Sequence, residues 1–323
     1  MTIIVTGAAG FIGYHVATAL LARGERVIGI DNFDPYYSVG LKRARVAELA
    51  RHQGFTLEEL DLARPGTAEV LAPRYGDTSA IVHLAAQPGV RAAEQDPYRY
   101  IAANLAGQLT VLEIARRLKG LRHTVYASTS AVYGATPHRP FALDDRADQP
   151  ISLYGATKRG AEMIAISYAA QYGLALTGLR FFTVYGPWGR PDMATWKFTE
   201  AIANGTPLTL FDDGKMSRSF TYIDDIVAGV LAALDRAPSA GAHKLYNLGN
   251  DKSESVRRYL EVLEQAVGKK ALIVVEPRHR ADMTDTAADI SLSERELGWR
   301  PRVAIDQGLP RFVAWYRDYT ARR

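Results

Sequence analysis

The sequence contains no cysteine, which excludes disulfide bonds and any reaction that uses a thiolate. It also has no uninterrupted apolar run of the roughly 20 residues that a helix needs to cross a bilayer, so we expect no membrane-spanning segment. The first residues, Met1 to Gly7, lead directly into a strand-like run without the basic and apolar regions of a signal peptide. These absences predict a soluble cytoplasmic protein with no membrane partner.

Charge of one sign is not in excess either. The 39 basic and 35 acidic residues leave a net charge of +4 and are spread along the chain. Such a distribution offers no concentrated patch for nucleic acid and favours an anionic ligand only mildly. The 47% hydrophobic and 23% charged residues are typical of a globular chain, and 323 residues suffice for a large buried core. We therefore expect no nucleic-acid partner.

Short apolar strands alternate with helical stretches through the first half of the sequence. The pattern predicts strands at residues 2–6, 26–30, near 80–84, 123–128 and 174–181, and helices at 11–23, 99–118 and 152–172. This alternation is typical of a parallel sheet with helices on both faces. After Tyr185 the pattern becomes irregular, so we expect a main domain at 1–185 and a smaller α/β region mainly at 186–323. Residues 244–248 read as a strand, which predicts that a segment near 220–250 returns to the main sheet.

A glycine-rich turn follows the opening strand. Gly7, Gly10 and Gly13 precede an apolar helix; glycine lets the backbone approach a pyrophosphate, and a helix N-terminus offers free N–H donors. The next strand ends at Asp31, near the spacing of about 20 residues expected for an acid that binds the adenosine ribose. A carboxylate there would repel a 2′-phosphate, so the pattern predicts a Rossmann-type doubly wound sheet that binds NAD. A plain helix-packing turn, with Asp31 as a turn residue, is the structural alternative.

Tyr154 and Lys158 lie four residues apart near the start of a helix, hence one turn apart on the same face. A phenol with a pKa of about 10 is a poor base at neutral pH, but a neighbouring cation and a positive nicotinamide ring would lower that pKa. Such a tyrosine suits general acid-base chemistry on a sugar hydroxyl. Upstream, Thr129 ends a strand where hydroxyl side chains can face a cofactor. Taken alone, this Tyr and Lys spacing also occurs on amphipathic helices without any function.

These features, in this order and spacing, resemble the extended short-chain dehydrogenase/reductase family. The resemblance covers nearly the whole chain and continues through segments 180–187, 218–225 and 246–249. It implies that Thr129, Tyr154 and Lys158 are catalytic and that NAD is the cofactor. The expected NAD contacts are Gly7, Gly10, Phe11, Ile12, Gly13, Asp31, Asn32, Asp61, Leu62, Leu84, Ala85, Ala86, Asn104, Tyr154, Lys158 and Tyr185.

The residues beside Thr129 bear on which reaction the chain performs. Dehydratases of the family carry an Asp-Glu pair directly after the Thr, and UDP-glucuronate decarboxylases carry a Glu in place of Ala131; here the two positions hold Ser130 and Ala131. With no second acid or base, the resemblance implies oxidation of a nucleotide sugar at C4 and return of hydride to the other face. This reaction is an epimerisation, in which NAD is regenerated and stays tightly bound.

The segment from Tyr185 to Ala194 is similar to the UDP-glucuronate 4-epimerase branch of the family. The similarity implies a UDP-sugar substrate, interconversion of UDP-glucuronate and UDP-galacturonate through a 4-keto intermediate, and no metal. A UDP-glucose 4-epimerase is the alternative, followed by a UDP-glucuronate decarboxylase. We expect the hydroxyls of Thr129, Ser130 and Thr183 to hold the carboxylate; the structural alternative is that the neighbours of Thr129 only cap a strand end.

Cations are expected at the diphosphate of the substrate. Arg218 can make a bidentate contact. Arg190 and Arg91 are further candidates, each equally consistent with a solvated surface arginine. Asp282 matches the family acid on the nucleotide ribose, and the role of the nearby Arg280 stays open. The full set of expected substrate contacts is Arg91, Thr129, Ser130, Thr183, Arg190, Leu210, Phe211, Arg218, Arg280 and Asp282.

The resemblance also implies a homodimer, in which the helices at 99–118 and 152–172 pack into an intersubunit four-helix bundle. A protein of a different class, an NAD-binding redox sensor without catalysis, typically lacks the Tyr or the Lys, and this chain has both. We therefore expect an NAD-dependent isomerase of carbohydrate metabolism.

Overall fold

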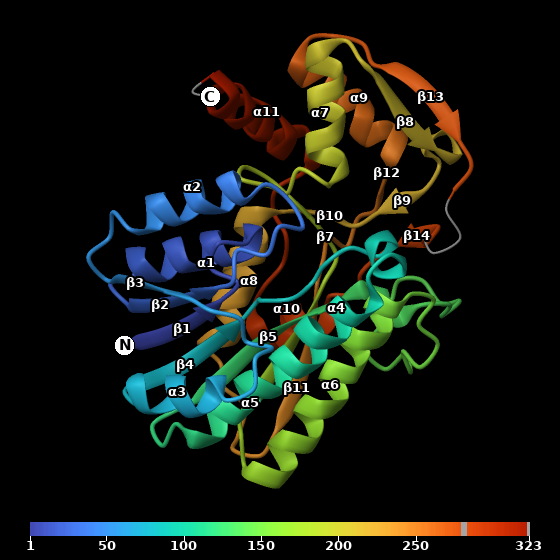
Figure 1. Ribbon diagram of the computed structural model, residues 1–323. Helices are drawn as coiled ribbons and strands as arrows, with labels where there is room; N and C mark the ends of the chain where they lie inside the picture. Colours follow the sequence, from blue (N-terminus) through green and yellow to red (C-terminus); the bar gives the residue numbers. More distant parts are fainter. Residues whose placement is uncertain (279–282, 322–323) are drawn as a thin grey trace.

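Seven parallel strands form the centre of the computed structural model, which describes residues 1–278 and 283–321 (Figure 1). Across the sheet the order is β11, β6, β5, β4, β1, β2, β3. The bounds are β1 (Thr2–Thr6), β2 (Arg26–Asp31), β3 (Phe55–Glu59), β4 (Thr78–His83), β5 (His123–Thr129), β6 (Leu176–Phe181) and β11 (His243–Leu248). The parallel sheet expected from the sequence is confirmed, and so is the late strand that joins it beside β6.

Helices cover both faces of this sheet (Figure 1). On one side lie α1 (Phe11–Ala22), α2 (Val39–Leu49) and α8 (Ile223–Leu234), and on the other α3 (Thr67–Arg74), α5 (Gly107–Arg117) and α6 (Leu153–Tyr172). All five residues of β1 are buried, as expected for a central strand between two helical layers. The chain runs outward from β1 to β3 on one side and from β4 on the other. The carboxyl ends of β1 and β4 therefore frame a crevice where the strand order reverses.

Local signals set the start and end of α6. The hydroxyl of Ser152 accepts a hydrogen bond from the backbone N–H of Gly155 at 3.1 Å, which is an N-cap. Gly173 follows the helix with a φ of 68°, the left-handed conformation that commonly ends helices. The helix expected at 99–118 is less regular: it comprises α4 (Pro97–Ile101), a π-helical turn η2 (Ala102–Ala106) and α5.

A smaller region covers the carboxyl ends of the sheet strands (Figure 1). Its parallel strands β8 (Pro207–Phe211) and β13 (Leu272–Glu276) pack with α7 (Ala194–Asn204), α9 (Val256–Val267) and α11 (Ile305–Ala321). Trp196 of α7 makes edge contacts with the rings of Phe312 and Tyr316 of α11, so aromatic packing joins the first and last helices of this region.

Short elements connect the two regions. β7 (Thr183–Tyr185) pairs with β10 (Phe220–Tyr222), and β9 (Ser217–Arg218) pairs with both β12 (Glu254–Ser255) and β14 (Asp285–Thr286). The remaining helices are η1 (Arg91–Glu94), η3 (Ser130–Tyr133), η4 (Asp212–Gly214) and α10 (Ser291–Leu297). Within residues 1–278 and 283–321, every helix is too short or too polar to cross a bilayer.

Candidate active site

A cleft of about 260 Å³ opens at the carboxyl ends of β1, β2, β4 and β5 and is bordered by the segment 181–193. The crevice at this end of an open parallel sheet is where such folds bind ligands. Its wall brings together the glycine turn, Asp31, Thr129, Tyr154 and Lys158, which are far apart in the sequence.

The turn at the start of α1 can be built only from glycine. Gly7 has a φ of 70°, and a Cβ there would lie 2.7 Å from the nitrogen of Ala85. A Cβ on Gly13 would lie 2.0 Å from the carbonyl oxygen of Gly7. Gly10 begins the helix without a side-chain cap, and Gly10 to Gly13 line the cleft. The N–H groups of this helix start therefore fit an anionic pyrophosphate.

Asp31 is held rigidly at the end of β2. Its carboxylate accepts hydrogen bonds from the N–H groups of Ala9 at 3.0 Å and Phe33 at 2.9 Å. Burial raises the pKa of Asp31, and the nearby Lys42 cation opposes that rise. A carboxylate fixed beside the glycine turn fits the hydroxyls of a ribose. Other expected cofactor residues that line the cleft are Phe11, Ile12, Asn32, Asp61, Leu62, Leu84, Ala85 and Ala86.

Two expected cofactor residues lie outside the wall of the cleft. The Asn104 amide is buried in the π-helical turn, donating to the carbonyl of Gln87 at 3.1 Å and to the hydroxyl of Thr157 at 3.0 Å. Asn104 therefore braces the loop after β4 against α6. Tyr185 packs among aromatic rings, and its hydroxyl donates to the carbonyl of Ala304 at 3.3 Å. The side chain of Tyr185 is thus part of the core.

The three expected catalytic side chains meet in one part of the cleft. Tyr154 and Lys158 lie one turn apart on α6, and Thr129 ends the neighbouring β5. Thr129 is close enough to Tyr154 for its hydroxyl to lower the pKa of the phenol. Burial lowers the pKa of Lys158 to about 8, while the Glu162 carboxylate favours the charged form. This geometry suits proton transfer between a phenol and a substrate hydroxyl.

The pKa of Tyr154 differs from the sequence expectation. We expected the Lys158 cation and a bound nicotinamide ring to lower it together; in the protein alone, burial raises it because an enclosed phenolate loses its hydration. The opposing influences are the hydrogen bond from Thr129 and the Arg190 cation. Arg190, rather than Lys158, is therefore the protein cation that lowers the pKa of Tyr154.

A buried ion pair lies next to the predicted catalytic residues. The Glu162 carboxylate, one turn beyond Lys158, accepts two hydrogen bonds from Arg180 of β6, both at 2.9 Å. It also accepts from Ser128 at 2.5 Å and Arg159 at 2.8 Å. Because Ser128 directly precedes Thr129, this cluster fixes the end of β5 relative to α6.

Arg190 lies in the wall of the cleft and pairs with Asp192 at 3.0 and 2.5 Å. Asp192 also accepts a hydrogen bond from the Tyr36 hydroxyl at 3.3 Å. The predicted substrate cation is thus oriented by residues on two different segments.

The other expected substrate residues are more dispersed. The Arg91 guanidinium lies 4.3 Å from the ring centroid of Phe211, so these two are brought together across the two regions. Arg218 donates to the carbonyls of Ser217 and Thr284 at 2.8 and 2.9 Å. Leu210 is a core side chain. Ser130 and Thr183 are half-buried next to lining residues, and Arg280 and Asp282 lie outside the described residues.

The sequence interpretation missed several residues of the cleft wall. Asp34, Tyr36 and Tyr37 follow Asp31, and Lys42 lies on the next helix. The available signal was a cluster of polar and aromatic residues around Pro35, directly after the strand that ends at Asp31. In the part of the chain that the structure describes, we find no group of three His, Asp or Glu side chains able to hold a metal ion.

This fold and cleft define an NAD-binding enzyme of the short-chain dehydrogenase type. The model of the NAD dependent epimerase/dehydratase family matches residues 3–249, and the chain belongs to that family. NAD is the cofactor of the family, and the glycine turn and Asp31 fit it.

Relatives and solved structures agree along the whole chain. UDP-glucuronate 4-epimerase 4 of Arabidopsis thaliana is 45% identical over 99% of this chain and 76% of its own length. A probable UDP-glucuronate 4-epimerase of Rhizobium meliloti is 41% identical over 100% of this chain and 98% of its own. The crystal structure of UDP-glucuronic acid 4-epimerase from Bacillus cereus, in complex with UDP-glucuronic acid and NAD, is 33% identical with a TM-score of 0.92. It covers 99% of this chain and 100% of that one.

Proposed function

We propose that the chain is a UDP-glucuronate 4-epimerase, which interconverts UDP-glucuronate and UDP-galacturonate with bound NAD. The observation that carries the proposal is full-length similarity to UDP-glucuronate 4-epimerases together with Thr129, Tyr154 and Lys158 in one cleft. Ser130 and Ala131 supply no acid or base beside Thr129, which favours epimerisation over dehydration or decarboxylation.

The chain's own residues account for the proton transfers. Tyr154 as the phenolate takes the proton of the sugar 4-hydroxyl; burial opposes the phenolate, and the positive charges of Arg190 and of a bound nicotinamide ring would favour it. Thr129 donates a hydrogen bond to the same oxygen, and Lys158 keeps the site positive. NAD supplies, when bound, a reversible acceptor for the hydrogen at C4. After the 4-keto sugar has rotated in the site and presented its other face, Tyr154 returns the proton to the oxygen on the epimerised carbon. The overall reaction involves no net oxidation or reduction, because cofactor and sugar end in their original oxidation states.

A carboxylate at C5 makes the 4-keto sugar a β-keto acid that readily loses carbon dioxide. The site must therefore hold the carboxylate while the sugar rotates. We assign this task to the hydroxyls of Thr129, Ser130 and Thr183. Arg190 adds a further cation in the wall of the cleft.

The proposal predicts a preference for the charged sugar. Hydrogen bonds to a charged group contribute about 1.5–3 kcal/mol, so kcat/KM for UDP-glucuronate should exceed that for UDP-glucose by about 10- to 100-fold. Steady-state rates with each nucleotide sugar measure the ratio. Equal rates, or faster turnover of UDP-glucose, would favour the alternative UDP-glucose 4-epimerase.

The pKa of Lys158 predicts a decline of activity at alkaline pH. A cation with a pKa of about 8 carries its proton at neutral pH and loses it above that value. We expect kcat to fall as the pH rises through about 8. Lys158→Arg, whose guanidinium stays charged, should shift that decline to higher pH. A profile with the same alkaline limb in both proteins would show that another group is responsible.

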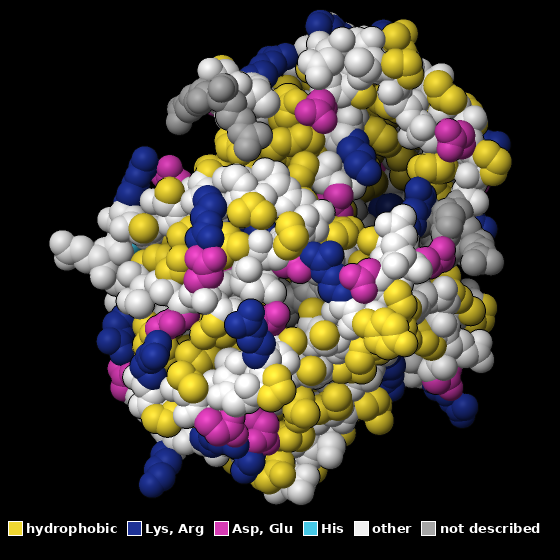
Figure 2. Space-filling model, in the orientation of Figure 1, with side chains coloured by type: hydrophobic (Ala, Val, Ile, Leu, Met, Phe, Trp, Pro, Cys, Tyr) yellow, Lys and Arg dark blue, Asp and Glu magenta, His cyan; other side chains and the backbone are white. Residues whose placement is uncertain are grey.

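We also propose a homodimer formed through α4, α5 and α6. Large hydrophobic side chains are exposed on these helices, and Figure 2 shows them gathered on one face. Among them are Tyr98, exposed at 84%, Met163 at 52% and Ile166 at 38%. Packing against the same helices of a second copy would bury this face and form the four-helix bundle.

The dimer can be tested by placing charged side chains on the exposed apolar face of α6. Met163→Lys with Ile166→Lys should shift the particle mass in light scattering from about twice 35.5 kDa to a single chain. Val275→Lys is the matched control, because Val275 is 56% exposed on β13 at the other end of the molecule. A wild-type protein that is monomeric at micromolar concentration would contradict the proposal.

The assignment of the two ligands to the two regions is a further part of the proposal. We assign NAD binding to residues 1–185 with the returning segment near 220–250, and UDP-sugar binding mainly to residues 186–323. The cytoplasmic location stays a prediction, which fractionation of the producing cells would check.

A further inference from the structure

Residues 31–38, which we call the cover segment, lead from the end of β2 across the cleft. Asp31, Asn32, Asp34, Tyr36 and Tyr37 of this segment all line its wall. The backbone is tightly turned, because Asn32 accepts from the N–H of Asp34 at 3.0 Å and Asp34 accepts from the N–H of Tyr36 at 2.9 Å. The segment is therefore a preformed wall of the cofactor site.

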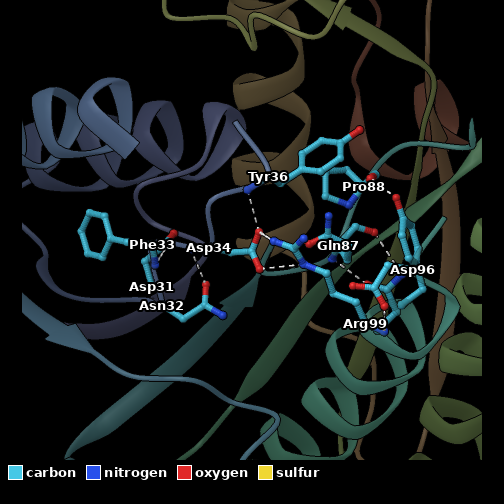
Figure 3. Close-up of polar contacts among 11 residues, drawn as sticks. Asp31, Asn32, Phe33, Asp34, Tyr36, Gln87, Pro88, Asp96 and Arg99 are labelled. Atoms are coloured by element: carbon cyan, nitrogen blue, oxygen red, sulfur yellow. Dashed lines mark hydrogen bonds and ion pairs between the residues drawn. The ribbon is translucent and has the colours of Figure 1, made fainter. Parts of the chain in front are cut away.

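An ion pair ties the middle of the cover segment to α4. Arg99 extends from α4 toward Asp34 (Figure 3), with its Nε 3.0 Å from Oδ2 of Asp34 and its Nη2 bonded to Oδ1. The two side chains are 31% and 23% exposed, so the pair is only partly screened by water. Arg99 itself lies outside the wall of the cleft.

Two further contacts hold the cover segment on the other side. The Tyr36 hydroxyl donates to Asp192 at 3.3 Å. It also packs against Gly89, where an added Cβ would lie only 2.3 Å from the hydroxyl oxygen. The Tyr37 hydroxyl accepts from Arg45 at 2.7 Å. The segment is thus fastened to the loop after β4, to α2 and to the segment 186–193.

We propose that Arg99 is a positioning residue for the cofactor: by pairing with Asp34 it holds the cover segment against the cleft and sets how slowly NAD leaves. Epimerisation regenerates the cofactor in each cycle. If the cofactor left between the two half-reactions, the 4-keto sugar could not be reduced again. The inference rests on the proposed function only in taking NAD as the bound dinucleotide; it is independent of the sugar.

The test measures release of NAD in the absence of any sugar. The full-length protein is loaded with radiolabelled NAD, chased with excess unlabelled NAD, and sampled over time. A partly exposed ion pair contributes up to about 1 kcal/mol, so Arg99→Gln should release NAD about fivefold faster. Arg99→Lys, which keeps the charge, should release it more slowly than Arg99→Gln. Arg23→Gln is the matched control, because it breaks the ion pair in which Nη1 of Arg23 donates to both carboxylate oxygens of Asp235, far from the cleft.

A second variant tests whether Arg99 and Asp34 act through the same ion pair or whether each substitution disturbs the structure by itself. Asp34→Asn should raise the release rate as much as Arg99→Gln, and the double variant should release NAD no faster than either single variant, because both remove the same interaction. Arg23→Gln should keep both the wild-type release rate and the wild-type kcat. A release rate that is unchanged in Arg99→Gln, or additive in the double variant, overturns the proposal. Failure of the chain to bind NAD at all would instead refute the proposed function.

Discussion

Tyr154→Phe should lower kcat by a factor of about 10² to 10⁴, the range that a positioned acid-base group contributes. The variant removes only the phenol oxygen, whose pKa the Thr129 hydroxyl at the end of β5 lowers. The ring and its edge contact with Tyr100 at 6.3 Å remain, so the cleft should keep its shape and its NAD. Steady-state kinetics with UDP-glucuronate, and the NAD content of the purified protein, measure the two effects separately.

Tyr168→Phe provides the control on the same helix. Its hydroxyl donates to Glu113 at 2.9 Å, on a part of α6 away from the cleft. We expect this variant to retain wild-type kcat. Normal turnover in Tyr154→Phe would show that another group transfers the proton.

Glu162→Ala should lower the free energy of unfolding by about 3–5 kcal/mol, because removal of one partner of a buried ion pair leaves charge buried without compensation. The Glu162 side chain is 0% exposed and that of Arg180 is 2% exposed. Four donated hydrogen bonds would be lost from three elements. Urea denaturation followed by circular dichroism measures the change.

Glu48→Ala is the corresponding control at the surface. Glu48 pairs with Arg51 at 2.7 Å, and the two side chains are 37% and 74% exposed. Exposed pairs contribute about 1 kcal/mol or less, so the variant should unfold near the wild-type midpoint. Equal losses in the two variants would mean that the Glu162 cluster contributes no more than a surface pair.

The sequence could predict the parts of the fold that depend on local patterns of residues. The alternation of strands and helices, the glycine turn and Asp31 each depend on residues close together in the chain. Tyr154 and Lys158 share a helix face by spacing alone. These predictions needed only the rule that carboxyl ends of parallel strands meet at one edge of a sheet.

The residues whose surroundings the sequence could not predict depend on contacts between distant segments. Asn104 is turned into the protein by a π-helical turn, and Tyr185 is held in an aromatic core, so both leave the cleft wall. The pairs of Arg99 with Asp34 and of Arg180 with Glu162 join residues 65 and 18 positions apart. No local pattern predicts such partners. The rise in the pKa of Tyr154 was equally hidden from the sequence, because burial depends on the whole fold.

The central claim is that this cleft inverts C4 of a uronate while keeping its carboxylate. The most direct test incubates the purified protein with UDP-glucuronate, adds no NAD, and follows the sugar by proton and carbon NMR. We predict accumulation of UDP-galacturonate, with an inverted C4 centre and an intact carboxyl carbon. Loss of the carboxyl carbon as carbon dioxide, or recovery of unchanged UDP-glucuronate from protein that contains NAD, would contradict the account.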